Sequence, residues 1–398
     1  MRERSANWVL AAIFATSLGV GLIFGFEPPL IAIVLNRAGH GSVVIGTVIA
    51  ISLVAVIVIG PFYPVAIARL GLYRSVVVGV SVGVVVLLLM PVWIGVPAWI
   101  ALRIVTGCGL GLGWIASEIW MNIASGAASR GAVMGIYGTV FSTGTVAGPL
   151  LLELTGTRGS LPFVIGAVCL ALTLLPLVLL PQAARQGAAQ RSAAKSTRTA
   201  ARSLRALLSF LPAAPIVMMA AAVAGLVESA DLSLLPLYGL QAGLDEHTAL
   251  LLVTVFLAGN VVLQFPIGLL ADRVGRRFVL GLCALASTIG PLLLPFALDR
   301  GALLWPLLFV WGGTLYAFYS QGVALLGEAF TPDTLAGANT LFVMIYCVGG
   351  VIGPSAGGLA MALWPHRGLP VLLCAAALSL GVALAVGALR RARALGRA

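Results

Sequence analysis

Long apolar runs dominate the pattern of this chain. Apolar residues continue for about 20 positions at a time, the length a helix needs to cross ~30 Å of hydrocarbon, and short polar stretches separate the runs. In chain order the runs predict twelve transmembrane helices, at residues 8–35, 43–67, 75–94, 98–122, 132–154, 161–180, 213–240, 248–270, 278–297, 303–327, 335–363 and 369–389. We therefore expect an all-α membrane protein.

Composition and charge agree with this class. Hydrophobic residues make up 61% of the 398 and charged residues only 9%, whereas a soluble domain carries about 25% charged residues. With both termini in the cytoplasm, eighteen of the 23 Lys and Arg lie on the cytoplasmic side and four on the other. This asymmetry predicts a multi-pass protein of the bacterial cytoplasmic (inner) membrane. The net charge of +11 then faces anionic lipid headgroups, not nucleic acid.

One long polar stretch divides the chain. Residues 1–180 are expected to form an N-terminal six-helix bundle, residues 212–398 a C-terminal one, and residues 181–211 a cytoplasmic linker. From Arg202 onward the linker shows the leucine spacing of a short helix in the membrane interface. Simple continuation into the next span is the alternative.

The two halves are related by an internal repeat. A shift of 204 residues superposes Glu27 on Asp231 and Gly71 on Gly275, and a shift of 205 superposes Gly148-Pro149 on Gly353-Pro354. Two pseudo-symmetric six-helix bundles of parallel orientation are the architecture of a rocker-type secondary transporter, with its solute site between the halves near mid-membrane.

A polar turn follows the eighth predicted span. It contains Gly268, Asp272, Arg273, Gly275, Arg276 and Arg277. Gly275 permits a tight turn, and the charges suit headgroups or helix ends. The string resembles the signature loop of the major facilitator superfamily, which implies a conformational latch; a turn that merely fixes topology is the alternative. The first-half counterpart keeps Arg69 and Gly71 but has lost the aspartate.

A glycine-rich string lies in the eleventh predicted span, with a shorter copy in the fifth. The positions are Gly349, Gly353, Pro354, Gly357 and Gly358, and Gly144, Gly148 and Pro149. Glycines four apart flatten a helix face for close packing, and a proline bends the helix. The string resembles the superfamily's antiporter motif, although the fifth-span copy lacks the terminal glycine pair. Helix packing and antiport both remain open.

Two further strings carry a resemblance. Arg103-Ile-Val-Thr-Gly107 resembles the superfamily's fourth-helix arginine motif, which implies a role in proton transfer. Arg103 follows Trp99 by four residues, so snorkelling to the outer interface is an equal alternative. With the polar turn, the strings Trp114-Ile-Ala-Ser-Glu118 and Leu-Pro-Leu-Tyr238 resemble the YcaD-like branch of the superfamily. This resemblance extends over nearly the whole chain.

Acidic residues inside the spans are the main candidates for chemistry. A charged side chain at mid-bilayer costs ~2.5–3.5 kcal/mol and usually faces a cavity or a partner. Glu228 and Asp231 lie three residues apart on one helix face, and two carboxyl groups so close in a membrane do not readily ionise at the same time. Glu27 precedes Pro28-Pro29, which should break the helix. We expect Glu27, Glu118, Glu228 and Asp231, with Arg103, to couple transport to protons; interhelical hydrogen bonding is the alternative.

Uncharged polar residues in spans eight and ten are candidate cavity liners: Asn260, Gln264, Tyr316, Tyr319 and Gln321. The five cysteines lie within spans and the three histidines in outside loops, so we expect no metal site and no cofactor beyond the proton gradient.

The sequence favours a proton-coupled exporter of a small amphipathic or drug-like solute. The alternatives are a proton symporter that imports a nutrient or organic acid and, in another class, a membrane receptor or scaffold that transports nothing. No hydrolase, zinc-protease or nucleotide-binding motif occurs in the sequence, so we expect no enzyme. The expected partners are membrane lipids, the solute and protons, and the protein is expected to be a monomer.

Overall fold

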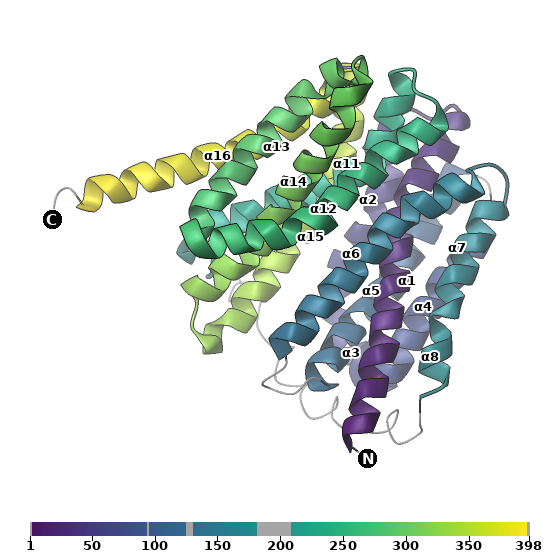
Figure 1. The fold of residues 1–398 in the computed structure, drawn as a ribbon. Helices are drawn as coiled ribbons and strands as arrows, with labels where there is room; N and C mark the ends of the chain where they lie inside the picture. The colour runs from purple at the N-terminus through teal and green to yellow at the C-terminus, as the bar shows by residue number, and fades with distance from the viewer. Residues whose placement is uncertain (1, 94, 125–129, 181–207, 396–398) are drawn as a thin grey trace. The chain divides into compact units, whose positions relative to one another are not determined.

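The computed structural model describes residues 2–93, 95–124, 130–180 and 208–395, and within these ranges the chain forms helices and turns with no strand (Figure 1). The α-helices are α1 (Arg2–Arg37), α2 (Ser42–Ile59), α3 (Tyr63–Leu70), α4 (Leu72–Leu89), α5 (Val96–Ala124), α6 (Arg130–Thr155), α7 (Leu161–Leu172), α8 (Leu174–Val178), α11 (Pro215–Gln241), α12 (Glu246–Val274), α13 (Arg276–Leu298), α14 (Gly301–Ala329), α15 (Pro332–Leu363) and α16 (Gly368–Leu395). Short 3₁₀ turns lie at Gly60–Phe62 and Leu211–Ala213.

These helices confirm the predicted membrane fold. Eleven segments in the described ranges are long and apolar enough to cross a membrane; one joins α2 to α3 (Ser42–Leu70) and another joins α7 to α8 (Leu161–Val178). The remaining predicted span, the fifth at residues 132–154, corresponds to α6, a helix of 26 residues that carries several glycines and hydroxyl side chains. The interfacial helix predicted from Arg202 lies outside the described residues as far as residue 207.

The chain packs as two compact units. One comprises Met1–Val34 and Ile51–Arg202, and the other comprises Leu35–Ala50 and Ser203–Ala398. In the first unit α4 packs along α5 and α7; in the second, α11 packs along α15 and α14, and α12 along α14. The predicted division assigned residues 35–50 to the first bundle by sequence order, whereas their contacts are with the second unit.

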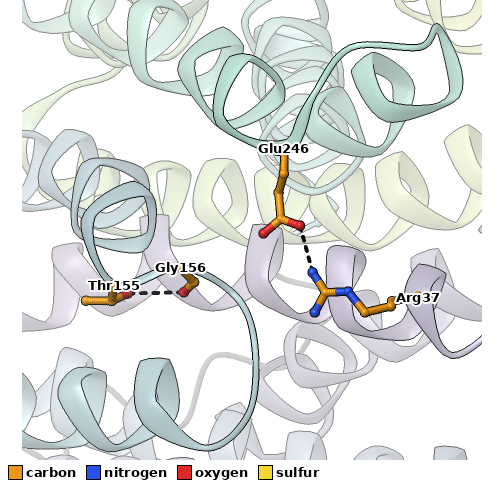
Figure 2. A network of polar contacts seen from close by, with 4 residues as sticks. All are labelled: Arg37, Thr155, Gly156 and Glu246. Carbon is orange, nitrogen blue, oxygen red and sulfur yellow. Dashed lines mark hydrogen bonds and ion pairs between the residues drawn. The ribbon is translucent and has the colours of Figure 1, made fainter.

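The segment Leu35–Ala50, which joins α1 to α2, attaches to α12 and α15. Figure 2 shows the guanidinium of Arg37 at the end of α1 reaching the carboxylate of Glu246 at the start of α12, 2.7 Å away. The Ser42 hydroxyl donates to the Gly358 carbonyl of α15 over 2.7 Å. In the first unit, Figure 2 also shows Thr155, the last residue of α6, whose hydroxyl donates to the carbonyl of Gly156.

The internal repeat reappears in the backbone of the turns. Gly39 and Gly243, 204 residues apart, have φ of 82° and 89°, and Gly71 and Gly275, also 204 apart, have φ of 80° and 99°. A side chain is strained at such positive φ, which glycine adopts freely. The same turns therefore end equivalent helices in both halves of the chain.

The prediction that Pro28-Pro29 breaks the first helix is wrong. α1 runs unbroken from Arg2 to Arg37 with both prolines inside it. A proline removes one backbone hydrogen bond and bends a helix, but packing against neighbouring helices holds such helices together in membrane proteins. Leu30 and Ile31, directly after the prolines, are fully buried, which is the packing that keeps the helix intact.

Candidate functional site

A buried ion pair joins two helices of the first unit. The guanidinium of Arg103 on α5 lies 2.6 Å from the carboxylate of Glu27 on α1, and both side chains are buried, with exposures of 6% and 5%. Arg103 also donates to the hydroxyl of Ser52 on α2 over 2.6 Å. Opposite charges at this distance compensate each other, which a buried charge requires.

The alternative that Arg103 snorkels to the outer interface is wrong. Its marker, Trp99, does not face an interface: the side chain is 3% exposed and its indole N–H donates to the Met90 carbonyl over 3.1 Å. Arg103, one turn further along α5, therefore also points into the unit. The sequence marked Glu27 and Arg103 as separate candidates and did not find that they form a pair with Ser52.

The second unit holds two acids on one face of α11. Glu228 accepts a hydrogen bond from the hydroxyl of Tyr346 on α15, with an O···O distance of 2.8 Å. Asp231 is fully buried, and neither of its carboxylate oxygens has a hydrogen-bond partner among the described residues. A buried polar group in this state carries the full cost of desolvation. The two halves thus treat equivalent acids differently, since Glu27 has a cationic partner.

Tyrosines surround this pair of acids. Tyr346 stacks edge-on against Tyr319 of α14, with ring centroids 5.1 Å apart. Tyr316, also on α14, lies within electrostatic reach of both Glu228 and Asp231 and packs against Phe256 of α12, with centroids 6.4 Å apart. The structure therefore brings the predicted residues Tyr316 and Tyr319 together with the acids, and it adds Tyr346, which the sequence analysis missed.

The other candidate liners differ in their surroundings. Asn260 and Gln321 are each 4% exposed, and the side-chain carbonyl oxygen of each lacks a partner within the described ranges. Gln264 is exposed. In the first unit Glu118 is half-buried and accepts a hydrogen bond from the indole of Trp114 over 2.8 Å.

The polar turn after α12 forms a small ion-pair network. Arg276 at the start of α13 pairs with Asp272 near the end of α12, at 2.7 Å, and with Glu328 near the end of α14, at 2.9 Å. Arg273 and Arg277 are exposed, and Gly268 has no neighbour that a side chain would meet. The turn therefore ties the ends of α12, α13 and α14 together inside the second unit.

The glycine strings lie where helices approach most closely. A Cβ on Gly349 or Gly353 of α15 would strike the backbone of α11 at Ala222 and Leu226. A Cβ on Gly144 or Gly148 of α6 would strike the backbone of α1 at Leu18 and Leu22 in the same way. Gly357 faces Leu234, Gly358 faces the backbone of Ser42, and Pro149 and Pro354 lie inside their helices.

Comparison with known proteins agrees with this architecture. The family model described as Major Facilitator Superfamily matches residues 9–251 and 241–397. The uncharacterized MFS-type transporter YfkF of Bacillus subtilis is 25% identical over 382 residues, which is 92% of each chain. The uncharacterized MFS-type transporter YcaD of Escherichia fergusonii is 27% identical over 73% of this chain and 72% of its own.

Solved structures share the fold. A mutant of the nucleoside transporter NupG superposes with a TM-score of 0.78 at 14% identity, over 95% of this chain and 99% of its own. A D-xylose–proton symporter superposes with a TM-score of 0.72 at 16% identity, over 93% and 96%. The family match spans nearly the whole chain, and the relatives are named as transporters, not enzymes. The protein is therefore a multi-pass membrane transporter of the Major Facilitator Superfamily, similar to its YcaD-type members.

Proposed function

We propose that this protein is a proton-coupled secondary transporter that exports a small amphipathic solute by antiport. The observation that supports it is the acid pair on α11, in which Asp231 has no hydrogen-bond partner among the described residues and Glu228 has a neutral one, Tyr346. An ionised carboxylate in this position carries an uncompensated desolvation cost. A proton is the smallest cation that removes that cost, so binding and release of a proton would change the energy of the surrounding helices.

The setting supports an exporter in the cytoplasmic membrane. The excess of Arg and Lys in alternate polar segments favours cytoplasmic termini by the positive-inside rule. A proton moving inward can then drive a solute outward. The partners are protons, the solute and membrane lipids, and the working unit is a monomer.

Proton symport is the second candidate. Asn260 and Gln321 present buried carbonyl oxygens without partners in the described part of the chain, and such acceptors suit a neutral solute rich in hydroxyl groups. One protein of the same fold is named as a D-xylose–proton symporter. The direction of flux distinguishes the candidates: solute and protons move in opposite directions in antiport and in the same direction in symport.

The test is a solute screen in proteoliposomes with an imposed pH gradient. The native protein should exchange one solute class for protons. Glu228→Gln should lose gradient-driven flux while keeping downhill exchange, and Asp231→Asn should lose gradient-driven flux as well. Asp299→Asn, which changes an exposed carboxylate at the end of α13, is the matched control. Full gradient-driven transport by both acid variants would overturn the coupling assignment. Solute binding with no flux at all would favour the receptor alternative.

A further inference from the structure

The internal repeat can be placed in register from helix contacts. In the first unit a Cβ on Gly107 of α5 would strike the carbonyl oxygen of Ser52 on α2, and in the second a Cβ on Gly312 of α14 would strike the carbonyl oxygen of Phe256 on α12. Ser52 and Phe256 are 204 residues apart, and Gly107 and Gly312 are 205 apart. The two crossings are therefore equivalent, which fixes the correspondence of side chains around them.

This register shows what the second unit has lost. Glu27 corresponds to Asp231, so the acid is kept. Arg103, four residues before Gly107, corresponds to Leu308, four residues before Gly312, and Ser52 corresponds to Phe256. The cation that pairs with Glu27 in the first unit, and the hydroxyl that accepts a hydrogen bond from that cation, are thus replaced by two buried apolar side chains, 0% and 1% exposed.

We infer that Asp231 anchors the cationic group of the solute, a protonated or quaternary amine attached to an aromatic or apolar body; this inference rests on the proposed transport function. Asp231 has no hydrogen-bond partner in the described ranges. It also lacks the cationic partner that its counterpart Glu27 has in Arg103. A cationic solute supplies that partner during transport.

An aromatic cluster that begins at Tyr316, which lies within electrostatic reach of Asp231, suits such a solute. Phe256 packs edge-on against Trp311, with centroids 5.0 Å apart, and against Tyr316. Aromatic rings attract organic cations through their electron-rich faces. On α12 and α14 of the same unit, Asn260 and Gln321 carry buried carbonyl oxygens without a partner in the described ranges. Such oxygens accept hydrogen bonds from an ammonium group but cannot neutralise an anion.

Competition for one carboxylate explains exchange. The titratable groups near Asp231 are Glu228 on its own helix, Tyr316 and Tyr319 on α14 and Tyr346 on α15; the charged residues described on α12 and α16 lie at the helix ends. None of these neighbours is a base that could hold Asp231 ionised. A proton or the solute cation therefore neutralises Asp231, one excluding the other, which gives antiport from a single site.

Binding to the purified protein tests this inference without a proton gradient. The cationic probes are tetraphenylphosphonium, ethidium and benzyltrimethylammonium, which span three sizes, and tetraphenylborate is the anionic probe of the same shape as the first. At least one cation should bind saturably and tetraphenylborate should not. Asp231→Asn should weaken that binding tenfold or more, and Glu246→Gln, which changes a carboxylate at the end of a helix in the same unit, should leave it unchanged.

A transplant of the missing cation gives the sharper variant. Leu308→Arg places a guanidinium at the position of Arg103, where it should occupy Asp231, abolish cation binding and leave the protein folded, as judged by gel filtration and thermal unfolding. If Leu308→Arg does not fold, Asp231→Asn and Asp231→Glu decide the test. Failure of all three cations to bind, equal binding of tetraphenylborate, or unchanged affinity in Asp231→Asn would each overturn the inference. Cation binding without proton-driven flux would keep it and overturn the proposed function instead.

Discussion

Single residues decide how each half of the chain carries its buried acid. Glu27 is paired with Arg103, which also donates to Ser52, and the two opposite charges compensate each other. Asp231, at the equivalent position, has no such partner among the described residues. The contrast assigns different work to the two acids in the proposed cycle: the first is a structural link between α1 and α5, and the second is the site at which charge changes during transport.

The structural role of the first pair can be tested by breaking it from one side. Glu27→Gln leaves the Arg103 charge buried and uncompensated, which should destabilise the protein by about 3–5 kcal/mol. Glu27→Gln combined with Arg103→Met removes both charges and should recover most of that loss. Thermal unfolding of the purified variants measures both effects.

The exposed pair of Arg37 and Glu246 is the matched control. Its side chains are 39% and 34% exposed, so Glu246→Gln should change stability by no more than about 1 kcal/mol. A double variant of Glu27 and Arg103 that is less stable than Glu27→Gln alone would contradict the assignment of these two residues as an ion pair.

Helices approach to backbone contact at positions of both glycine strings, as the helix-packing interpretation expects. Gly349 and Gly353 face the backbone of α11, and Gly144 and Gly148 face that of α1. The same arrangement in both units shows that close packing accounts for the spacing. In the second unit this packing holds α15 against α11, the helix that carries the two acids, so a role of the glycine string in antiport would act through the position of α11.

Adding one methyl group tests this packing. Gly353→Ala places a Cβ against the carbonyl of Leu226, and such overpacking should cost about 1–3 kcal/mol. Gly281→Ala on α13 is the control, because nothing lies near its Cβ position and alanine is the better helix former by about 1 kcal/mol. The midpoint temperature of thermal unfolding should thus fall in Gly353→Ala and rise in Gly281→Ala. A neutral or stabilising Gly353→Ala would contradict the close contact.

Sequence reasoning reached the helices but not their partners. The runs of apolar residues have the length that a bilayer demands, and twelve acidic residues in 398 make each one inside a run conspicuous. Glu228 and Asp231 are visible in this way, since both lie on one helix. Tyr346 and Ser52 are not, because they come from other helices, and the register between packed helices depends on side-chain shapes that periodicity does not encode.

Two errors have a local cause. The snorkelling alternative for Arg103 depends on Trp99, which marks an interface only if its indole faces the headgroups; here the indole bonds to Met90 inside the unit. The rule that two prolines break a helix applies to a helix exposed to water, but not to Pro28 and Pro29, where neighbouring helices enclose the segment. In both cases the tertiary surroundings overrode a rule that treats one helix alone.

At the scale of the whole molecule, the internal repeat and the charge asymmetry together predict one orientation in the membrane. The turns around Gly39 and Gly71 have matching counterparts at Gly243 and Gly275, so the repeat predicts that both halves cross the membrane in the same sense. The turns at Gly39 and Gly243 follow odd-numbered spans, and those at Gly71 and Gly275 follow even-numbered ones. The charge asymmetry predicts that the turns after even-numbered spans lie in the cytoplasm.

Cysteine labelling in spheroplasts tests this orientation directly. Gly41 and Arg74 are exposed residues next to the first two turns, and the five native cysteines lie within helices, where they can be replaced by alanine or serine as a background. In that background a membrane-impermeant maleimide should label Gly41→Cys in intact spheroplasts and Arg74→Cys only after lysis. The reverse pattern would invert the protein, and an inward proton gradient would then meet Asp231 from the opposite face. The labelling pattern therefore tests the topology alone: in antiport the solute moves against the proton flux in either orientation, so export is tested separately by the direction of solute flux under an imposed pH gradient.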